Sequence, residues 1–181
     1  MPKENTIKLK ETIRSISDWP IKGVIFRDLT TLMQNPEAFR ESCDILYERY
    51  KDKNIDKIVG IDARGFVFGA VLAYKLGIGF IPVRKKGKLP APVMEQEYEL
   101  EYGTDIIEIH KDSLKNGTKV LLVDDLLATG GTALAAAALI EKLGGIISEM
   151  CFIVNLPDVG GSGKLIEKGY KFYALTEFEG E

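Results

Sequence analysis

The chain of 181 residues is poor in the residue types that build disulfides, metal sites and membrane spans. Its two cysteines, Cys43 and Cys151, lie far apart in apolar patterns, which favours buried reduced thiols over a bridge. The only histidine, His110, ends an expected strand, where a structural role is the ordinary interpretation. No apolar run reaches the roughly 18 residues that cross a bilayer, and the polar N-terminus lacks a signal core. We therefore expect a cytoplasmic protein with no membrane partner.

An excess of positive charge is also absent. The chain carries 24 Lys and Arg against 27 Asp and Glu, a net charge of −3. This balance excludes a broad nucleic-acid-binding face, although it allows a local basic pocket for a small polyanion. With 45% apolar residues and no repeat or linker, residues 1–181 are expected to form a single domain with its own core.

Apolar spacing predicts an α/β fold with a central, mostly parallel sheet flanked by helices. A first short helix is expected around Leu9, Ile13 and Ile16, followed by an irregular segment over residues 23–31. Asn35 caps the next helix, which starts at Pro36. Further strands are expected at 58–61, 80–83, 120–124, 150–154 and 172–175, with helices at 66–76, after Thr132 and near 164–168.

Two features predict a lid. Residues 98–102 and 106–110 flank Gly103-Thr104 and indicate a β-hairpin projecting from the sheet. Before it, residues 85–96 form a long connection with four basic residues at its base, which suggests a mobile loop that closes over substrate.

Two acids follow the most apolar strand. Val120–Val123 show no alternation, as in a parallel strand buried on both faces, and Asp124 and Asp125 come at its carboxyl end. Because ligands of open α/β sheets bind at that edge, these carboxylates are placed to accept hydrogen bonds from the vicinal hydroxyls of a ribose.

The next five residues form a candidate phosphate cradle: Ala128, Thr129, Gly130, Gly131 and Thr132. The glycines allow close approach of the backbone, the start of an alanine-rich helix adds unpaired N–H groups, and two threonine hydroxyls complete the set. The alternative is an ordinary strand-turn-helix whose glycines serve packing and whose acids face solvent.

The whole run from Val120 to Thr132 resembles the signature that type I phosphoribosyltransferases use for 5-phospho-α-D-ribose 1-diphosphate (PRPP). Stretches 23–30, 62–66, 83–90 and 98–105 resemble, in the same order, the members of that family that act on adenine. The resemblance implies the type I phosphoribosyltransferase fold with a β-hairpin lid, and transfer of the 5-phosphoribosyl group from PRPP to adenine, giving AMP and diphosphate. It also implies a homodimer, and Mg²⁺ bound mainly through PRPP and water.

Residues that handle the diphosphate are implied by the same resemblance. Arg64 is a catalytic residue that lies against the diphosphate with the backbone of Ala63 and Gly65, while Lys85 and Lys88 approach from the base of the lid. Arginine offers a bidentate fork and lysine a point charge. An additional lysine at position 86 departs from the usual pattern, so the order of residues leaves open which lysine contacts the diphosphate.

For the base, the resemblance points to Ile25, Phe26 and Arg27: a main-chain contact from Ile25, stacking on Phe26, and Arg27 near a ring nitrogen. On the hairpin, Tyr102 would shield the ribose and Glu101 would act as the acid-base group for the purine. Without the resemblance, Phe26 reads as a core residue, and Glu99 and Glu101 as solvent-facing residues of a hairpin whose tyrosines pack inward.

Two rival functions differ in testable ways. A phosphoribosyltransferase for hypoxanthine or xanthine would have to recognise a 6-oxo group, which accepts where the 6-amino group of adenine donates. A PRPP-binding regulator of transcription would need a nucleic-acid-binding element, for which this acidic chain has no room. The segment 160–164, GGSGK, resembles the end of a P-loop, but Asp158 and Leu165 occupy positions that require Gly and Ser or Thr. We expect a turn before a helix there.

Overall fold

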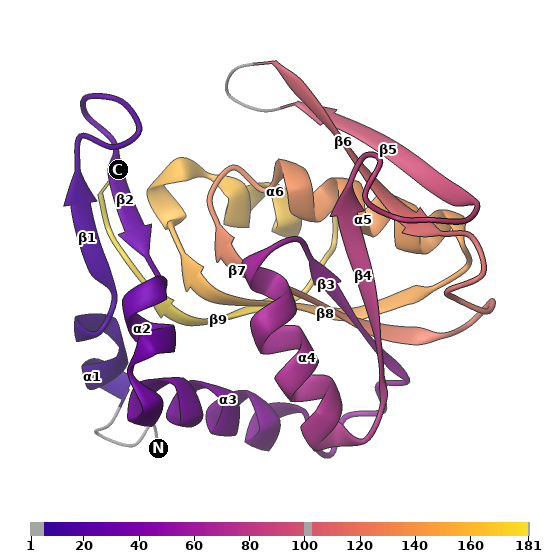
Figure 1. Ribbon diagram of the computed structural model, residues 1–181, viewed down its shortest axis with the longest axis horizontal. Helices are drawn as coiled ribbons and strands as arrows, with labels where there is room; N and C mark the ends of the chain where they lie inside the picture. Colours follow the sequence, from indigo (N-terminus) through magenta and orange to yellow (C-terminus); the bar gives the residue numbers. More distant parts are fainter. Residues whose placement is uncertain (1–5, 100–102, 181) are drawn as a thin grey trace.

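The computed structural model describes residues 6–99 and 103–180, with side chains from residue 9 onward. Among these residues, seven strands form a central sheet in the order β5-β6-β4-β3-β7-β8-β9, and β1 and β2 form a separate pair (Figure 1). The central strands are β3 (Lys57–Ile61), β4 (Gly79–Lys85), β5 (Val93–Glu99), β6 (Thr104–His110), β7 (Lys119–Leu127), β8 (Ile146–Asn155) and β9 (Phe172–Glu177). The remaining elements are α1 (Thr6–Glu11), β1 (Arg14–Ser17), β2 (Ile25–Asp28), α2 (Thr30–Gln34), α3 (Pro36–Tyr50), α4 (Arg64–Leu76), α5 (Gly131–Lys142), the 3-10 turn η1 (Pro157–Val159) and α6 (Gly161–Glu167).

The central sheet is mostly parallel, as predicted. Strands β4, β3, β7, β8 and β9 pair in parallel, while β6 runs antiparallel to both β4 and β5. The carboxyl ends of the parallel strands therefore meet at one edge, where open α/β sheets bind their ligands.

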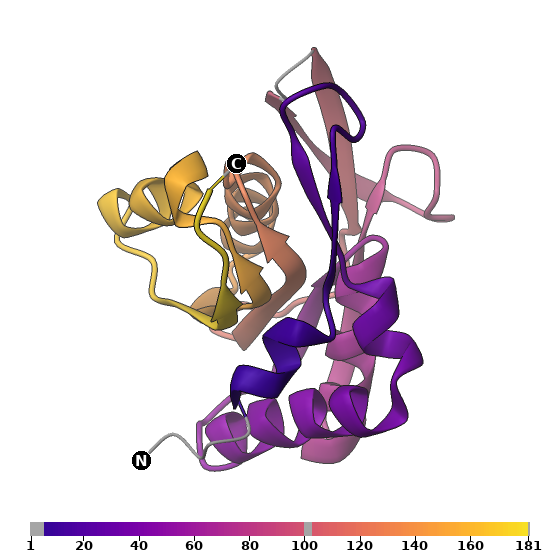
Figure 2. The same cartoon turned by 90° about the vertical axis from the view of Figure 1, so that its left-hand side faces the viewer.

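Helices cover both faces of the sheet (Figures 1 and 2). Along β7, Leu121 and Val123 belong to the core that includes α3 and α4, while Val120 and Leu122 belong to the core that includes α5 and α6. All four side chains are buried, which confirms the prediction of a strand covered on both faces.

The second predicted helix is confirmed at its start. The side chain of Asn35 accepts hydrogen bonds from the backbone N–H groups of Glu37 and Ala38, each at 3.1 Å, and Pro36 is the first helical residue. Cys43 on this helix and Cys151 on β8 are free, buried thiols, as expected, and burial raises their pKa values to about 11 and about 12. No helix in the described part of the chain is long and apolar enough to span a membrane.

The predictions for residues 13–31 are wrong. The first helix ends at Glu11, and residues 14–17 form β1, which pairs with β2 where an irregular segment was expected. Long-range partners decide this: Arg14 forms an ion pair with Asp28 at 2.5 Å, and its backbone N–H donates to the Thr31 hydroxyl at 3.1 Å. Such pairing across the chain overrides the helical spacing of Leu9, Ile13 and Ile16.

The connection before the hairpin is shorter than predicted. Strand β4 runs to Lys85 and β5 starts at Val93, so residues 86–92 make the turn. The buried Glu108 carboxylate accepts hydrogen bonds from the N–H groups of Gly87, Lys88 and Leu89 at 2.8–3.1 Å. Burial raises the pKa of Glu108, but these three donors outweigh it and lower the pKa overall. The turn is thus held by an acid, which the prediction of a long loop missed.

The hairpin forms one edge of the sheet and packs on α5. The second strand, β6, contains the predicted residues 106–110, but the first, β5, starts earlier in the chain than expected because Val93–Gln96 also find partners in β6. Along β5 the side chains alternate: Glu95, Glu97 and Glu99 are exposed, whereas Tyr98 is half-buried. At the other end of the turn, His110 Nε2 contacts the carbonyl oxygen of Pro90 at 2.5 Å, which supports its structural role.

Candidate active site

The acid pair lies inside β7 and not after it. On one side, pairing with β3 stops at Val123, but on the other side pairing with β8 continues to Leu127. The ladder to β8 therefore extends the strand past the predicted end. Beyond Val123, the edge of β7 that faces β3 has no strand partner among the described residues, and Asp124 and Asp125 lie in this stretch.

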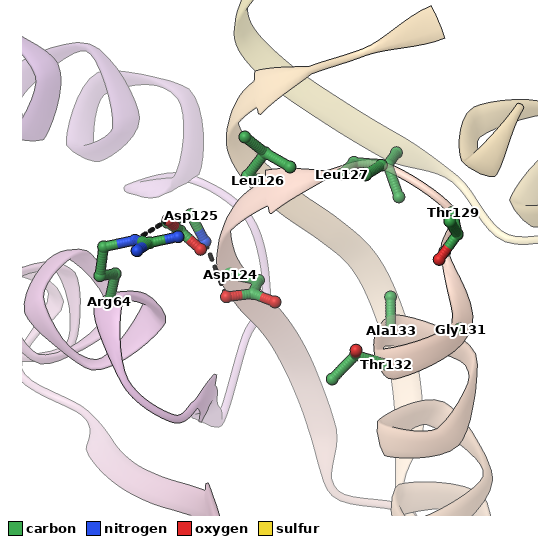
Figure 3. Close-up of a pocket in the computed structure, with 11 residues that line it drawn as sticks. Arg64, Asp124, Asp125, Leu126, Leu127, Thr129, Gly131, Thr132 and Ala133 are labelled. Carbon is green, nitrogen blue, oxygen red and sulfur yellow. Dashed lines mark hydrogen bonds and ion pairs between the residues drawn. The ribbon is translucent and has the colours of Figure 1, made fainter. Parts of the chain in front are cut away.

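Arg64 reaches the acid pair from the start of α4. Its Nε donates to Oδ2 of Asp125, and Figure 3 shows the two side chains meeting across the end of β7. The contact depends on Gly65, because a Cβ added there would lie 2.8 Å from the carbonyl oxygen of Val123. The absence of a side chain at Gly65 lets the first turn of α4 approach β7 closely.

The two neighbouring carboxyl groups influence each other's charge. Burial, and next the negative charge of Asp125, raise the pKa of Asp124 well above its usual value. The backbone N–H of Asp125 donates to Oδ1 of Asp124 at 2.8 Å and partly opposes this shift. The site thus combines two adjacent carboxyl groups, one of which is paired to arginine, a set able to accept hydrogen bonds from hydroxyl groups.

A cavity of about 210 Å³ opens beside the acid pair. It is lined by Arg64 and by the continuous run of residues 124–133, which includes all five residues of the predicted phosphate cradle (Figure 3). Gly130 adopts a left-handed conformation (φ 78°) that turns the chain into α5, whose first N–H groups have no partner within the helix. The volume of the cavity is below the roughly 300 Å³ of a drug-sized pocket, so the cavity suits one end of a ligand, such as a phosphate.

The end of the hairpin lies against the cradle. A Cβ added to Gly131 would be 3.0 Å from the carbonyl oxygen of Glu99 and 3.7 Å from the Tyr98 ring. The Tyr98 hydroxyl is 3.4 Å from Oδ2 of Asp105, which also forms an ion pair with Lys85 at 3.1 Å. Glu101 and Tyr102, assigned to the lid from the sequence, lie outside the described residues.

The predicted lysines lie beside the cavity lining and not within it. Both are exposed: Lys85 ends β4 and forms an ion pair with Asp105, and Lys88 lies on the turn that Glu108 holds. The hydrogen bond from Lys85, and next that from the backbone N–H of Ile106, lower the pKa of Asp105, while the contact with Asp105 raises the pKa of Lys85. Sequence reasoning missed both Asp105 and Glu108; an acid at position 108 between Ile107 and Ile109 was the available signal.

Phe26, one of the three residues predicted to hold a base, lies beside Arg64. Its ring centroid is 5.8 Å from the Arg64 guanidinium and 4.3 Å from the Trp19 ring, which packs edge-on. Ile25, its neighbour in β2, is partly buried. The chain thus brings β2, α4 and β7 together at one place, although they are far apart in sequence.

The side chain of Arg27 extends away from Arg64, since neighbouring residues of a strand face opposite sides. Its guanidinium donates to the Ser15 hydroxyl at 2.6 Å and stacks 4.4 Å from the ring centroid of Phe178. Burial lowers the pKa of Arg27. The structure therefore places Arg27 beneath the β1–β2 hairpin, next to the C-terminal segment.

Comparisons with known proteins agree with this geometry. A family model described as "Phosphoribosyl transferase domain" matches residues 28–179. A relative from Chlorobium limicola named adenine phosphoribosyltransferase is 63% identical over 175 residues, which cover 96% of this chain and 99% of the relative.

Solved structures give the same result. The crystal structure of adenine phosphoribosyltransferase from Thermoanaerobacter pseudethanolicus is 48% identical, with a TM-score of 0.91 and coverage of 96% of this chain and 99% of that one. The Saccharomyces cerevisiae enzyme of the same name, complexed with D-2,5-dideoxy-2,5-imino-altritol 1,6-bisphosphate and adenine, is 38% identical, with a TM-score of 0.87 and coverage of 94% and 97%.

Proposed function

Since the chain belongs to the phosphoribosyl transferase family, we propose that it transfers the 5-phosphoribosyl group from PRPP to adenine, forming AMP and diphosphate. The chain is an enzyme of purine salvage. The observation that carries this conclusion is the cavity in which an arginine, two carboxyl groups and an N–H-rich helix start line one wall. That set corresponds to the diphosphate, the ribose hydroxyls and the 5-phosphate of one donor molecule.

The reaction separates charge, and the site is built to stabilise it. As the bond from the anomeric carbon to the diphosphate breaks, the ribose gains positive character and the leaving group gains negative charge. Arg64, placed at the end of β7 by its pairing with Asp125, supplies a preorganised cation beside the reacting sugar. The cradle holds the 5-phosphate at a distance from the breaking bond, and that grip fixes the position of the anomeric carbon.

On the acceptor side, Phe26 offers an aromatic face beside Arg64, on which a purine stacks. The main chain of Ile25 is proposed to contact the amino group of the base. The role near a ring nitrogen proposed for Arg27 would require its guanidinium to turn away from Ser15 and Phe178. Glu101 is the proposed acid-base group for the purine, and Tyr102 shields the ribose. Lys85 and Lys88 complete the diphosphate side.

Mg²⁺ is the proposed cofactor, and the residues at the end of β7 fit it. The ion prefers oxygen ligands, and Asp124 and Asp125 present carboxylate oxygens on the cavity wall. Within residues 6–99 and 103–180 no group of three or more His, Cys, Asp or Glu side chains could hold a metal. The two acids would therefore hold the ion through water, with PRPP supplying its other ligands. When bound, Mg²⁺ neutralises negative charge on the diphosphate.

A homodimer in the cytoplasm is also part of the proposal. On α4, Val67 and Tyr74 lie two helical turns apart on one face, and they are 38% and 86% exposed. Exposed apolar side chains on one helix face support an interface there. The reduced thiols Cys43 and Cys151 fit a reducing compartment. Sedimentation velocity of the purified chain measures the oligomeric state.

Base specificity is the first prediction. With PRPP and Mg²⁺, the purified chain is expected to release diphosphate in the presence of adenine and to turn over hypoxanthine, guanine and xanthine at least 100-fold more slowly. The reason is that a site that accepts a hydrogen bond from a 6-amino group leaves its acceptor unpaired when a 6-oxopurine binds. Such a mismatch changes kcat/KM by roughly 10⁴-fold or more in favourable cases. Turnover of 6-oxopurines in preference to adenine would contradict the assignment.

The Lys85–Asp105 pair gives a second prediction. Asp105→Asn removes the charge that holds Lys85 but keeps a hydrogen-bonding side chain near Tyr98, so Lys85 becomes available to the diphosphate. We expect the KM for PRPP to fall by about two- to fivefold, the range of an exposed ion pair. Inhibition by diphosphate should strengthen by the same factor.

The matched control for Asp105→Asn is Glu95→Gln. Glu95 pairs with Lys86 at 3.0 Å on the same hairpin, so the substitution makes the same change in charge. It should leave the KM for PRPP unchanged. An equal fall in both variants would mean that net charge, and not release of Lys85, is responsible.

A further inference from the structure

A second layer of backbone supports the phosphate cradle from behind. The segment 160–164, which resembles the end of a P-loop, forms the turn and first residues of α6, next to the start of α5 on the same face of the sheet (Figures 1 and 2). The backbone N–H of Gly161 donates to the carbonyl oxygen of Ala128 at 2.9 Å, and Nζ of Lys164 donates to that of Thr129 at 3.2 Å. The carbonyl groups of Ala128 and Thr129 are therefore turned toward α6.

The direction of these carbonyl groups fixes the N–H groups that follow them. In a planar trans peptide, the C=O of one residue and the N–H of the next point in opposite directions. With the carbonyls of Ala128 and Thr129 directed at α6, the N–H groups of Thr129 and Gly130 point away from it. Neither N–H donates a hydrogen bond to any described residue. The cavity is lined by this loop but not by Gly161 or Lys164, so it lies on the side that these N–H groups face.

The two loops touch through backbone atoms. A Cβ added to Gly161 would lie 2.2 Å from the carbonyl oxygen of Ala128 and 2.8 Å from the backbone nitrogen of Gly130. From the opposite side, a Cβ on Gly130 would lie 3.2 Å from Cα of Gly161. Gly161 is not among the glycines with positive φ, so space and not conformation requires glycine there. Any side chain at position 161 would push the cradle loop toward the cavity.

We propose that Gly161 and Lys164 are positioning residues for the 5-phosphate of PRPP and AMP. They hold the carbonyl groups of the cradle loop on the α6 side, so that the N–H groups of Thr129 and Gly130 are presented to the phosphate before it binds. The ammonium of Lys164 adds a positive charge behind a cradle whose own residues carry none. This inference rests on the proposed function, because it assigns the phosphate end of that site.

The helix provides a matched pair of variants. Gly163 lies in α6 two residues after Gly161, also without positive φ, and a Cβ there would meet no atom within 4 Å. Gly161→Ala and Gly163→Ala therefore make the same chemical change in the same helix, but only the first acts on the cradle. Lys164→Gln and Lys168→Gln form a second pair, since Lys168 follows one turn later and is exposed.

The test measures binding of ribose 5-phosphate and of Mg²⁺-diphosphate separately by calorimetry. We expect Gly161→Ala to lower the affinity for ribose 5-phosphate at least tenfold and Lys164→Gln to lower it three- to tenfold. The affinity for diphosphate should change by less than twofold in both variants. Gly163→Ala and Lys168→Gln should bind both ligands like the parent chain. Unchanged ribose 5-phosphate affinity in both site variants, or equal loss of both ligands, overturns the proposal.

A folding check and an activity assay separate failure of the positioning role from failure of the proposed function. If Gly161→Ala does not fold, judged by circular dichroism, the Lys164→Gln and Lys168→Gln pair decides the proposal alone. Adenine turnover by Gly163→Ala tests the proposed function, because that variant leaves the cradle intact. If adenine is turned over and the site variants bind ribose 5-phosphate normally, the positioning role is wrong while the function stands.

Discussion

Arg64→Gln is expected to lower kcat/KM for AMP formation by about 10²–10³-fold, the usual loss when one preorganised charge donor at a developing anion is removed. Glutamine keeps a polar side chain of similar reach but cannot neutralise the departing diphosphate. Most of the loss should appear in kcat, because the charge on the leaving group develops in the transition state. Initial rates of diphosphate release, measured at several concentrations of PRPP and adenine, separate the two constants.

Arg49→Gln serves as the control for Arg64. Arg49 also pairs with a carboxylate, donating to Glu149 from Nε at 3.1 Å and from a terminal nitrogen at 2.9 Å, and it stacks on Tyr173. Its loss should lower the melting temperature while leaving kcat/KM within a few-fold. Arg64→Lys should remain poor, because lysine lacks the Nε–H group that donates to Asp125. A kcat for Arg64→Gln within threefold of the parent would remove Arg64 from the chemistry.

Asp125→Asn is expected to raise the KM for PRPP by about 10- to 150-fold while kcat changes little. A hydrogen bond to a charged group contributes about 1.5–3 kcal/mol, and the ribose hydroxyls lose such a partner. The side chain keeps its shape, so the melting temperature should move by only a few degrees. Arg64 also loses the ion-pair partner that positions it at the end of β7, which weakens its grip on the diphosphate and acts in the same direction.

Asp56→Asn controls for the loss of a carboxylate at β7. Oδ2 of Asp56 accepts a hydrogen bond from the backbone N–H of Lys119 at 2.8 Å, at the opposite end of the same strand. We expect unchanged kinetics from this variant. Equal KM values for PRPP in Asp125→Asn and the parent chain would show that the acid pair does not grip the ribose.

The parts of the fold that the sequence predicts well are those governed by local pattern. The unbroken apolar run Val120–Val123 identifies the central strand, and Asn35-Pro36 marks the start of α3. In the cradle, the glycines and threonines are contiguous, so one local motif defines the pocket wall. Such features depend on neighbours in the chain, which a sequence displays directly.

The parts that it misses depend on partners distant in the chain. Helical spacing at residues 9–16 gives way to a strand because Asp28 and Thr31 bond Arg14. The turn at 86–92 is fixed by Glu108, and β7 lengthens because β8 continues beside it. Segment 160–164 was assigned only as a turn, since its contacts with Ala128 and Thr129 join positions more than thirty residues apart. No short-range signal encodes these contacts.

The row of glutamates on β5 affects how copies of the chain meet. Strand β5 is the outermost strand of the sheet, and Glu95, Glu97 and Glu99 present their side chains to solvent along its length. A second copy that added its own β5 alongside would bring two such acidic rows together, and their mutual repulsion opposes fibre-like growth. The charges of Glu95, Glu97 and Glu99 thereby oppose strand-to-strand association of copies at this edge of the sheet.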